Sequence, residues 1–136
     1  MFHQIANSYS FHDTKIDRIS KSTDGVVLYF NEGIHTLNAT KSDENKTPPC
    51  KIRITINDFD ENNVFQHIEV KKQRKDRLKE IDFDSFLKIM KKEEFKVYLD
   101  YYCVVSRSIK LEGFIKKYFI SLTFFDVECI DIFYQT

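Results

Sequence analysis

Apolar and polar residues alternate with a period of two along most of this 136-residue chain. Between Lys51 and Asn57, for example, Ile52, Ile54 and Ile56 alternate with polar side chains. Neighbouring side chains of a β-strand point to opposite faces of the sheet, so this spacing indicates a strand with one buried face. The same pattern, rich in β-branched and aromatic residues, predicts strands at 14–21, 25–31, 34–38, 50–58, 64–73, 94–104, 107–115, 117–125 and 127–134.

The longest of these predicted strands has apolar side chains at every second position. We expect its odd-numbered side chains, from Phe95 to Tyr101, to be buried on one face of the sheet. Lys96 and Asp100 should then be exposed on the other face. Leu99 lies in the middle of the buried face, so its replacement by alanine should destabilise the protein strongly.

Two places depart from the alternation. In the first predicted strand Ile16 and Ile19 are three positions apart, and a β-bulge would explain this spacing. Residues 38–49 are polar, have no apolar period and end in Pro48 and Pro49. We interpret this segment as a long surface loop.

One segment has the period of an α-helix. Four apolar residues at positions i, i+3, i+4 and i+7 would share one face of it: Phe83, Phe86, Leu87 and Met90. Asp82 or Asp84 can cap the N-terminus, because a carboxylate accepts hydrogen bonds from the free backbone N–H groups of the first turn. The pattern predicts a helix at about 82–92.

Strands joined by short turns pair as antiparallel neighbours. With 42% apolar residues, 13 Phe and 7 Tyr, the chain has enough apolar material for one core. We therefore expect a single domain over residues 1–136 with an α+β fold. It should be a mostly antiparallel, curved β-sheet, as a partly open barrel or two packed sheets, with one helix near residues 82–92.

The charges balance, with 21 basic and 21 acidic side chains, so the overall charge favours neither nucleic acid nor an anionic membrane as partner. The first eleven residues lack the basic and apolar regions of a signal peptide. No apolar run approaches the ~20 residues that span a bilayer. The three cysteines form no CxxC pair, which is typical of free thiols in a reducing compartment. We expect a cytoplasmic protein that binds neither nucleic acid nor membrane.

Basic residues gather between Lys71 and Lys79. No aromatic residue lies among them to stack on bases. Glu80, Asp82 and Asp84 follow at once and cancel much of the positive field. We interpret the run as a solvated strand end and linker rather than as a phosphate-binding site.

Asp58, Asp60, Asn62 and Glu69 have the spacing of four ligand positions in a calcium-binding EF-hand loop. Such a loop is flanked by helices, whereas both flanks here alternate as strands, which favours a polar hairpin tip. The four histidines have no HxH or HExxH spacing. The chain also has no GxSxG motif and no glycine-rich loop. We therefore expect no metal, no cofactor and no catalytic residue.

His12 and Asp13 are adjacent, just before the first predicted strand. A histidine beside a carboxylate can act as a base with its orienting partner, or the histidine can bind a metal. Adjacent residues of a strand point to opposite faces, which places this pair poorly for a side-chain contact. We favour the interpretation that Asp13 caps a turn and His12 begins a strand.

An up-and-down arrangement of the strands would gather six candidate binding residues at one end of the sheet. Successive turns then fall at alternate ends, and six side chains meet: His12, Asp13, Glu32, Asp58, Asp60 and Glu61. Such an acidic edge could dock a basic protein partner and speed its association. Hairpin tips are also polar simply because they are in contact with water, and the sequence leaves both interpretations open.

The segment Phe11-His12-Asp13-x-x-Ile16-x-x-Ile19, followed by a turn and Val26-x-Leu28-x-Phe30, resembles a group of small bacterial proteins. These proteins are uncharacterised and open with an FHD or WHD triplet, and some are grouped with immunity proteins of polymorphic toxin systems. The resemblance covers about the first 30 residues. It implies a cytoplasmic partner-binding protein rather than an enzyme, and it transfers no residue role.

Three hypotheses follow. The first is a non-enzymatic bacterial partner-binding protein, such as an immunity protein that occludes a toxin. The second is a small-molecule-binding or enzymatic β-barrel with an aromatic-lined cavity. The third is a homo-oligomer with Tyr98 and Tyr102 buried between subunits. A packed interior would favour the first, and a deep pocket that holds a histidine and a carboxylate would favour the second.

Overall fold

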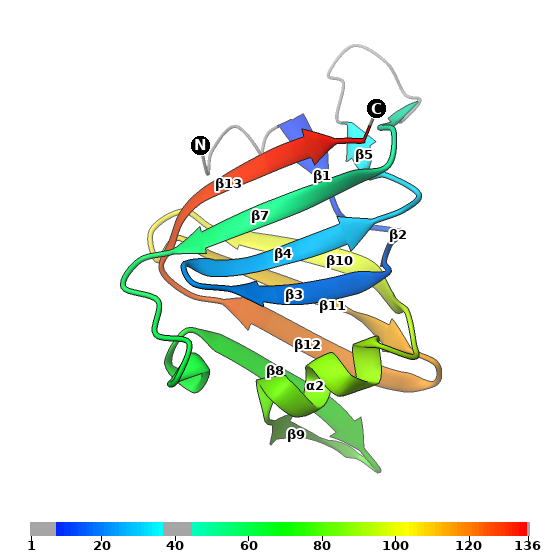
Figure 1. Ribbon diagram of the computed structural model, residues 1–136. Coiled ribbons are helices and arrows are strands. Elements are labelled where there is room, and N and C mark those ends of the chain that lie inside the picture. Colours follow the sequence, from blue (N-terminus) through cyan, green and yellow to red (C-terminus); the bar gives the residue numbers. More distant parts are fainter. Residues whose placement is uncertain (1–7, 37–44, 136) are drawn as a thin grey trace.

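The alternating segments form antiparallel strands in two large sheets and one small sheet (Figure 1). The structure is a computed structural model and describes residues 8–36 and 45–135. The largest sheet has six strands in the order β2 (Thr14–Ile16), β10 (Phe95–Cys103), β11 (Ser108–Ile115), β12 (Tyr118–Phe124), β8 (Ile68–Arg74) and β9 (Arg77–Ile81). The four-stranded sheet has the order β13 (Val127–Tyr134), β7 (Cys50–Ile56), β4 (Gly25–Phe30) and β3 (Arg18–Ser22). The small sheet contains β1 (Tyr9–Ser10), β5 (His35–Thr36) and β6 (Asn45–Lys46).

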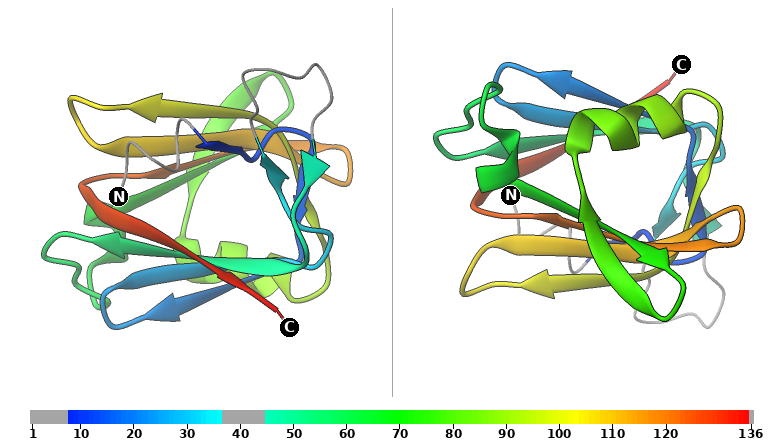
Figure 2. Two further views of the ribbon diagram at one scale, coloured as in Figure 1. Left: turned by 90° about the horizontal axis from the view of Figure 1, so that it is seen from above. Right: turned by 90° about the horizontal axis from the view of Figure 1, so that it is seen from below.

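The core lies between the two large sheets, which face each other (Figure 2). Ile52, Ile54 and Ile56 of β7 are buried, as their alternation predicted, and so are Leu111 and Leu122 of the opposite sheet. None of the sheets in the described residues closes into a barrel. The predicted α+β fold with a helix is therefore confirmed, and of its two forms the structure has packed sheets.

The predicted helix is α2 (Phe83–Met90). It begins where Asp82 caps it, since the Ser85 backbone N–H donates a hydrogen bond of 3.2 Å to the Asp82 carboxylate. Its apolar face is buried against the core, and the Phe86 ring meets the Phe95 ring edge-on at 6.2 Å between centroids. The helix packs on β3 and β8 and covers the open side between the two sheets (Figure 2).

The first predicted strand is divided rather than bulged. Ile16 ends β2 and pairs with Phe95, whereas Ile19 lies in β3 and pairs with Leu28 of the other sheet. Between them Asp17 turns the chain, and its carboxylate accepts a hydrogen bond of 2.7 Å from a backbone N–H after β4. The three-residue spacing therefore marks the point where the chain passes from one sheet to the other.

The prediction for β10 is correct in its first half and wrong in its second. Phe95 and Val97 are buried, but Leu99 and Tyr101 are 52% and 47% exposed. The register between β10 and β11 shifts between Val97 and Leu99. One extra residue at this bulge, Tyr98, exchanges the two faces of the strand for all residues that follow.

After the bulge, Asp100 and Tyr102 turn toward the protein interior, and Cys103 is exposed instead of continuing the apolar face. Gly113 makes the close pairing at the bulge possible. A Cβ atom on this residue would lie 1.8 Å from the backbone oxygen of Lys96, so any other residue would force β11 away from β10.

Three further expectations are corrected. The basic run is not a linker, because Lys71 lies on β8 and Lys79 on β9, and the two strands form a hairpin. The predicted strand 64–73 begins with a 3₁₀ turn, η1 (Val64–Gln66), before β8. Of the predicted strand 34–38, His35 and Thr36 form β5, and residues 37–44 lie outside the described residues. The predicted loop 38–49 is not wholly a loop, because Asn45 and Lys46 form β6. Within the described part of the chain, no helix has the length and apolarity needed to cross a bilayer.

Candidate functional site

The structure divides the predicted acidic edge between the two ends of the four-stranded sheet. Phe30 pairs with Cys50 at one end and Gly25 with Thr55 at the other. Glu32 follows β4 at the first end, whereas Asp58 follows β7 at the second. The prediction of one acidic edge is therefore wrong, because β5 pairs within the small sheet instead of carrying the chain back across the large one.

His12 and Asp13 contact each other, contrary to the expectation that they point apart. Nε2 of His12 lies 3.8 Å from a carboxylate oxygen of Asp13. Asp13 has φ 54° and so turns the chain in the left-handed region instead of extending it as a strand. The ring of His12 also stacks on the ring of His35, with 5.2 Å between centroids.

Ser10, His12 and Asp100 thus lie close together. Their contacts hold the turn before β2 in place and do not form a catalytic arrangement. The Ser10 hydroxyl lies 2.5 Å from Nδ1 of His12 and 3.4 Å from a carboxylate oxygen of Asp100. The same carboxylate accepts a hydrogen bond of 3.0 Å from the Phe11 backbone N–H. Ser10 is 5% exposed, so its hydroxyl is committed to this network and shielded from a substrate. Burial, with Asp100 close by, raises the pKa of the Tyr102 phenol.

Glu32 is neutralised by its surroundings. Its carboxylate lies 3.1 Å from the ammonium group of Lys15, which also lies 3.3 Å from Glu94. A hydrogen bond from Lys15 lowers the pKa of Glu32, and the two carboxylates raise the pKa of Lys15. Asp13 and Glu32 line a shallow groove of about 190 Å³ together with Lys46 and Lys96. This mixed charge gives the groove no preference for a basic partner.

At the opposite end, the loop between β7 and η1 carries Asp58, Asp60 and Glu61. The Asp60 carboxylate accepts hydrogen bonds from the loop itself, at 2.9 Å from the Asn62 backbone N–H and 2.7 Å from the Asn63 side chain. These bonds lower the pKa of Asp60, the one to Asn63 most. Within the described residues, no three His, Cys, Asp or Glu side chains are placed to hold a metal ion together.

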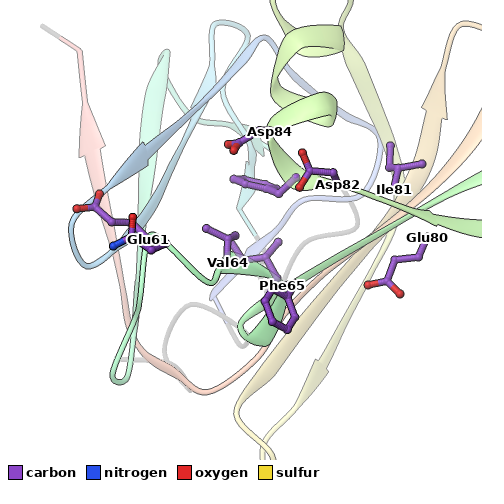
Figure 3. A pocket seen from close by; sticks show the side chains of 10 residues that line it. Glu61, Val64, Phe65, Glu80, Ile81, Asp82 and Asp84 are labelled. Atoms are coloured by element: carbon purple, nitrogen blue, oxygen red, sulfur yellow. The ribbon is translucent and has the colours of Figure 1, made fainter.

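A groove of about 380 Å³ lies between this loop and the start of α2. We call it the acidic groove, and ten residues line it: Glu61, Asn62, Val64, Phe65, Ile68, Glu80, Ile81, Asp82, Phe83 and Asp84. Figure 3 shows Glu61 and Glu80 on opposite sides of the groove, with Val64 and Phe65 between them. Its lining thus combines four carboxylates with apolar side chains and contains no lysine or arginine.

The four carboxylates differ in how far they are already engaged. Asp82 caps α2, and Asp84 lies 3.3 Å from the ammonium group of Lys21. Within the described residues, no hydrogen bond or ion pair of the protein engages the carboxylates of Glu61 and Glu80. Phe65 is 70% exposed, so an aromatic side chain is accessible next to these carboxylates.

Of the predicted binding residues, only Glu61 lines the acidic groove. Glu80, Asp82 and Asp84 were identified in the sequence, but as residues that balance the basic run or cap the helix. The signal that could have found them was their position directly after that run, between a strand and a helix. No sequence signal marked Phe65, because the predicted strand at 64–73 assigned it to a sheet.

Comparisons of the chain with protein-family models, with curated proteins and with solved structures find no match.

Proposed function

We propose that this chain is a non-enzymatic protein-binding protein whose acidic groove docks a basic, partly apolar segment of a partner protein. The observation that carries the proposal is the groove lining, where unengaged carboxylates flank exposed apolar side chains. A lysine or arginine side chain has the same two parts, an apolar stem and a charged head. Val64 and Phe65 would contact the stem while Glu61 and Glu80 attract the head.

The groove also has the electrostatics of a docking site. Opposite charges across an interface speed association and select partners. The chain as a whole has zero formal net charge, so the attraction is local to the groove rather than spread over the molecule. The wider surroundings include Lys21 beside Asp84 and Lys71 opposite Glu80 on the neighbouring strand, which limits how many basic groups the groove can accept.

The resemblance of the first 30 residues to bacterial immunity proteins suggests the class of partner. On that basis the partner is a toxin in the bacterial cytoplasm, and binding blocks the toxin by occlusion. The alternative function, a small-molecule-binding or enzymatic barrel, required an aromatic-lined interior cavity. The described strands instead pack as two sheets around a filled core, which favours a binding surface over an interior site.

The experiment is a calorimetric titration with a synthetic peptide in which lysine and leucine alternate. A Glu61→Gln/Glu80→Gln variant should bind this peptide about five- to thirtyfold more weakly at low salt, as expected for two exposed charge contacts. The matched control, Glu128→Gln/Asp131→Asn, removes two exposed charges from β13. It should bind like the wild type. Equal losses in both variants, or no binding by the wild type, would contradict the proposal.

A further inference from the structure

The outer face of the six-stranded sheet, opposite the core, exposes several large apolar side chains. It carries a row of apolar side chains across the strands. Tyr98 of β10 contacts Phe114 of β11 at 5.6 Å between ring centroids, and Phe114 contacts Phe119 of β12 at 5.7 Å. Phe114, Phe119 and Leu78 of β9 border a shallow hollow of about 350 Å³, together with Gln73, Asp76 and Arg77.

This row is incompletely buried. Tyr98 and Leu78 are 49% and 46% exposed, and Leu99 and Tyr101 lie beside the row with similar exposure. The β10 bulge creates this surface, because it turns Leu99 and Tyr101 away from the core. Apolar side chains gathered on one exposed face and bordered by polar residues are typical of an interaction site.

The charges next to the row have a regular arrangement about β12. In one line across the sheet, Glu112 of β11 and Lys71 of β8 lie on either side of Ser121. In the next line, Lys110 of β11 and Glu69 of β8 lie on either side of Thr123. Each line therefore has opposite charges at equal distances from β12, and the sign is reversed from one line to the next.

This pattern is complementary to itself. Consider two copies whose outer faces meet across a twofold axis that runs parallel to β12. The rotation places β11 of one copy over β8 of the other. It leaves the position of each residue along β12 unchanged. Glu112 then faces Lys71 of the second copy, and Lys110 faces its Glu69, each pair occurring twice. Phe119 contacts Phe119 of the second copy on the axis. Ser121, the next residue of β12 on this face, is small and 3% exposed, so it does not hold the two sheets apart.

We infer that two copies of this chain associate face to face through the six-stranded sheet, with β12 on the twofold axis. Self-complementary patches on a twofold axis are the commonest way in which soluble proteins form oligomers. Aligned packing of two sheets is likewise a common arrangement. The acidic groove lies toward α2 and the loop before η1, and Glu80 in its lining is the cross-strand neighbour of Lys71.

Analytical ultracentrifugation over a concentration series tests the dimer, and exchange of charges tests its geometry. Lys71→Glu alone and Glu112→Lys alone should each raise the dimer dissociation constant at least about tenfold, because like charges then face each other. The double variant Lys71→Glu/Glu112→Lys should restore dimerisation toward the wild-type value. Phe119→Asp should abolish it, whereas Phe133→Asp on the outer face of the other sheet should not.

Three results would overturn the inference. A wild-type protein that stays monomeric at millimolar concentration shows that the face is not self-associating. A dimer that is insensitive to Lys71→Glu and Phe119→Asp uses another surface. A double variant no better than the single variants shows that Lys71 and Glu112 do not face each other. Circular dichroism of each variant separates these outcomes from a failure to fold.

Discussion

The backbone N–H of Asp60 donates a hydrogen bond of 3.1 Å to Nε2 of His67. His67 is buried at the end of η1, and its ring contacts the Phe59 ring at 5.3 Å between centroids. The His67 side chain thus connects the loop between β7 and η1 to the start of β8. Because Glu61 belongs to that loop, His67 positions one wall of the acidic groove.

Replacement of His67 by phenylalanine should loosen this loop. The aromatic contact with Phe59 can be kept, but the Asp60 N–H loses its acceptor, which should cost about 1 kcal/mol in the free energy of unfolding. The affinity for the lysine-leucine peptide should fall as well, because Glu61 is no longer held in place. Urea denaturation and calorimetry measure the two effects. Full stability together with full affinity would show that the loop does not depend on His67.

The bulge in β10 is tested by two identical substitutions on neighbouring strands. Leu111→Ala on β11 removes a fully buried side chain and should destabilise the protein by about 2–5 kcal/mol. Leu99→Ala on β10 removes a half-exposed side chain and should cost less than about 0.5 kcal/mol. Chemical denaturation of both variants gives the comparison. A similar large loss for both would mean that β10 has no bulge and that Leu99 faces the core.

The ion pair between Asp24 and Arg53 predicts a pH dependence. A hydrogen bond from the guanidinium group lowers the pKa of Asp24. A carboxyl group with a lowered pKa in the folded state stabilises the protein above its unfolded value of about 4, and this stabilisation disappears as the pH falls through the folded pKa. Asp24→Asn should therefore lower the melting temperature slightly at pH 7 and have less effect at pH 2.

The control for this pair is Arg53→Gln. It should produce a similar small loss at pH 7, and the double variant should lose no more than either single variant. Additive losses would show that Asp24 and Arg53 act independently of each other.

The cap of α2 is tested at Asp82. Asp82→Ala should reduce stability by about 1 kcal/mol, because the Ser85 N–H loses its side-chain acceptor. Asp82→Asn keeps an oxygen acceptor and should cost much less, although it removes the same charge. If thermal denaturation shows the same loss for both variants, the contribution of Asp82 is electrostatic and not that of a hydrogen-bonded cap.

The sequence was most informative where one local pattern decides the structure. The alternation of Ile52, Ile54 and Ile56 placed β7 correctly, and the spacing from Phe83 to Met90 placed α2. Both patterns depend only on which face of an element is buried. The fold class followed from the number of alternating segments and the one helical segment.

The sequence was less informative where tertiary contacts decide. Nothing local shows that Tyr98 is the extra residue of a bulge, so Leu99 was assigned to the wrong face. The single acidic edge failed because it assumed that every alternating segment crosses the sheet, whereas β5 has two residues and pairs elsewhere. The acidic groove joins a loop to a strand end and a helix start, a juxtaposition that no spacing in the sequence encodes.

Mapping of peptide binding by NMR tests the central claim, that the acidic groove docks a basic segment. The lysine-leucine peptide would be titrated into isotopically labelled protein while the backbone amide signals are followed. We expect the largest shifts in the loop around Glu61, at Phe65 and from Glu80 to Asp84, and we expect them to weaken as salt is added. Shifts confined to other surfaces, or none at saturating peptide, would contradict the account.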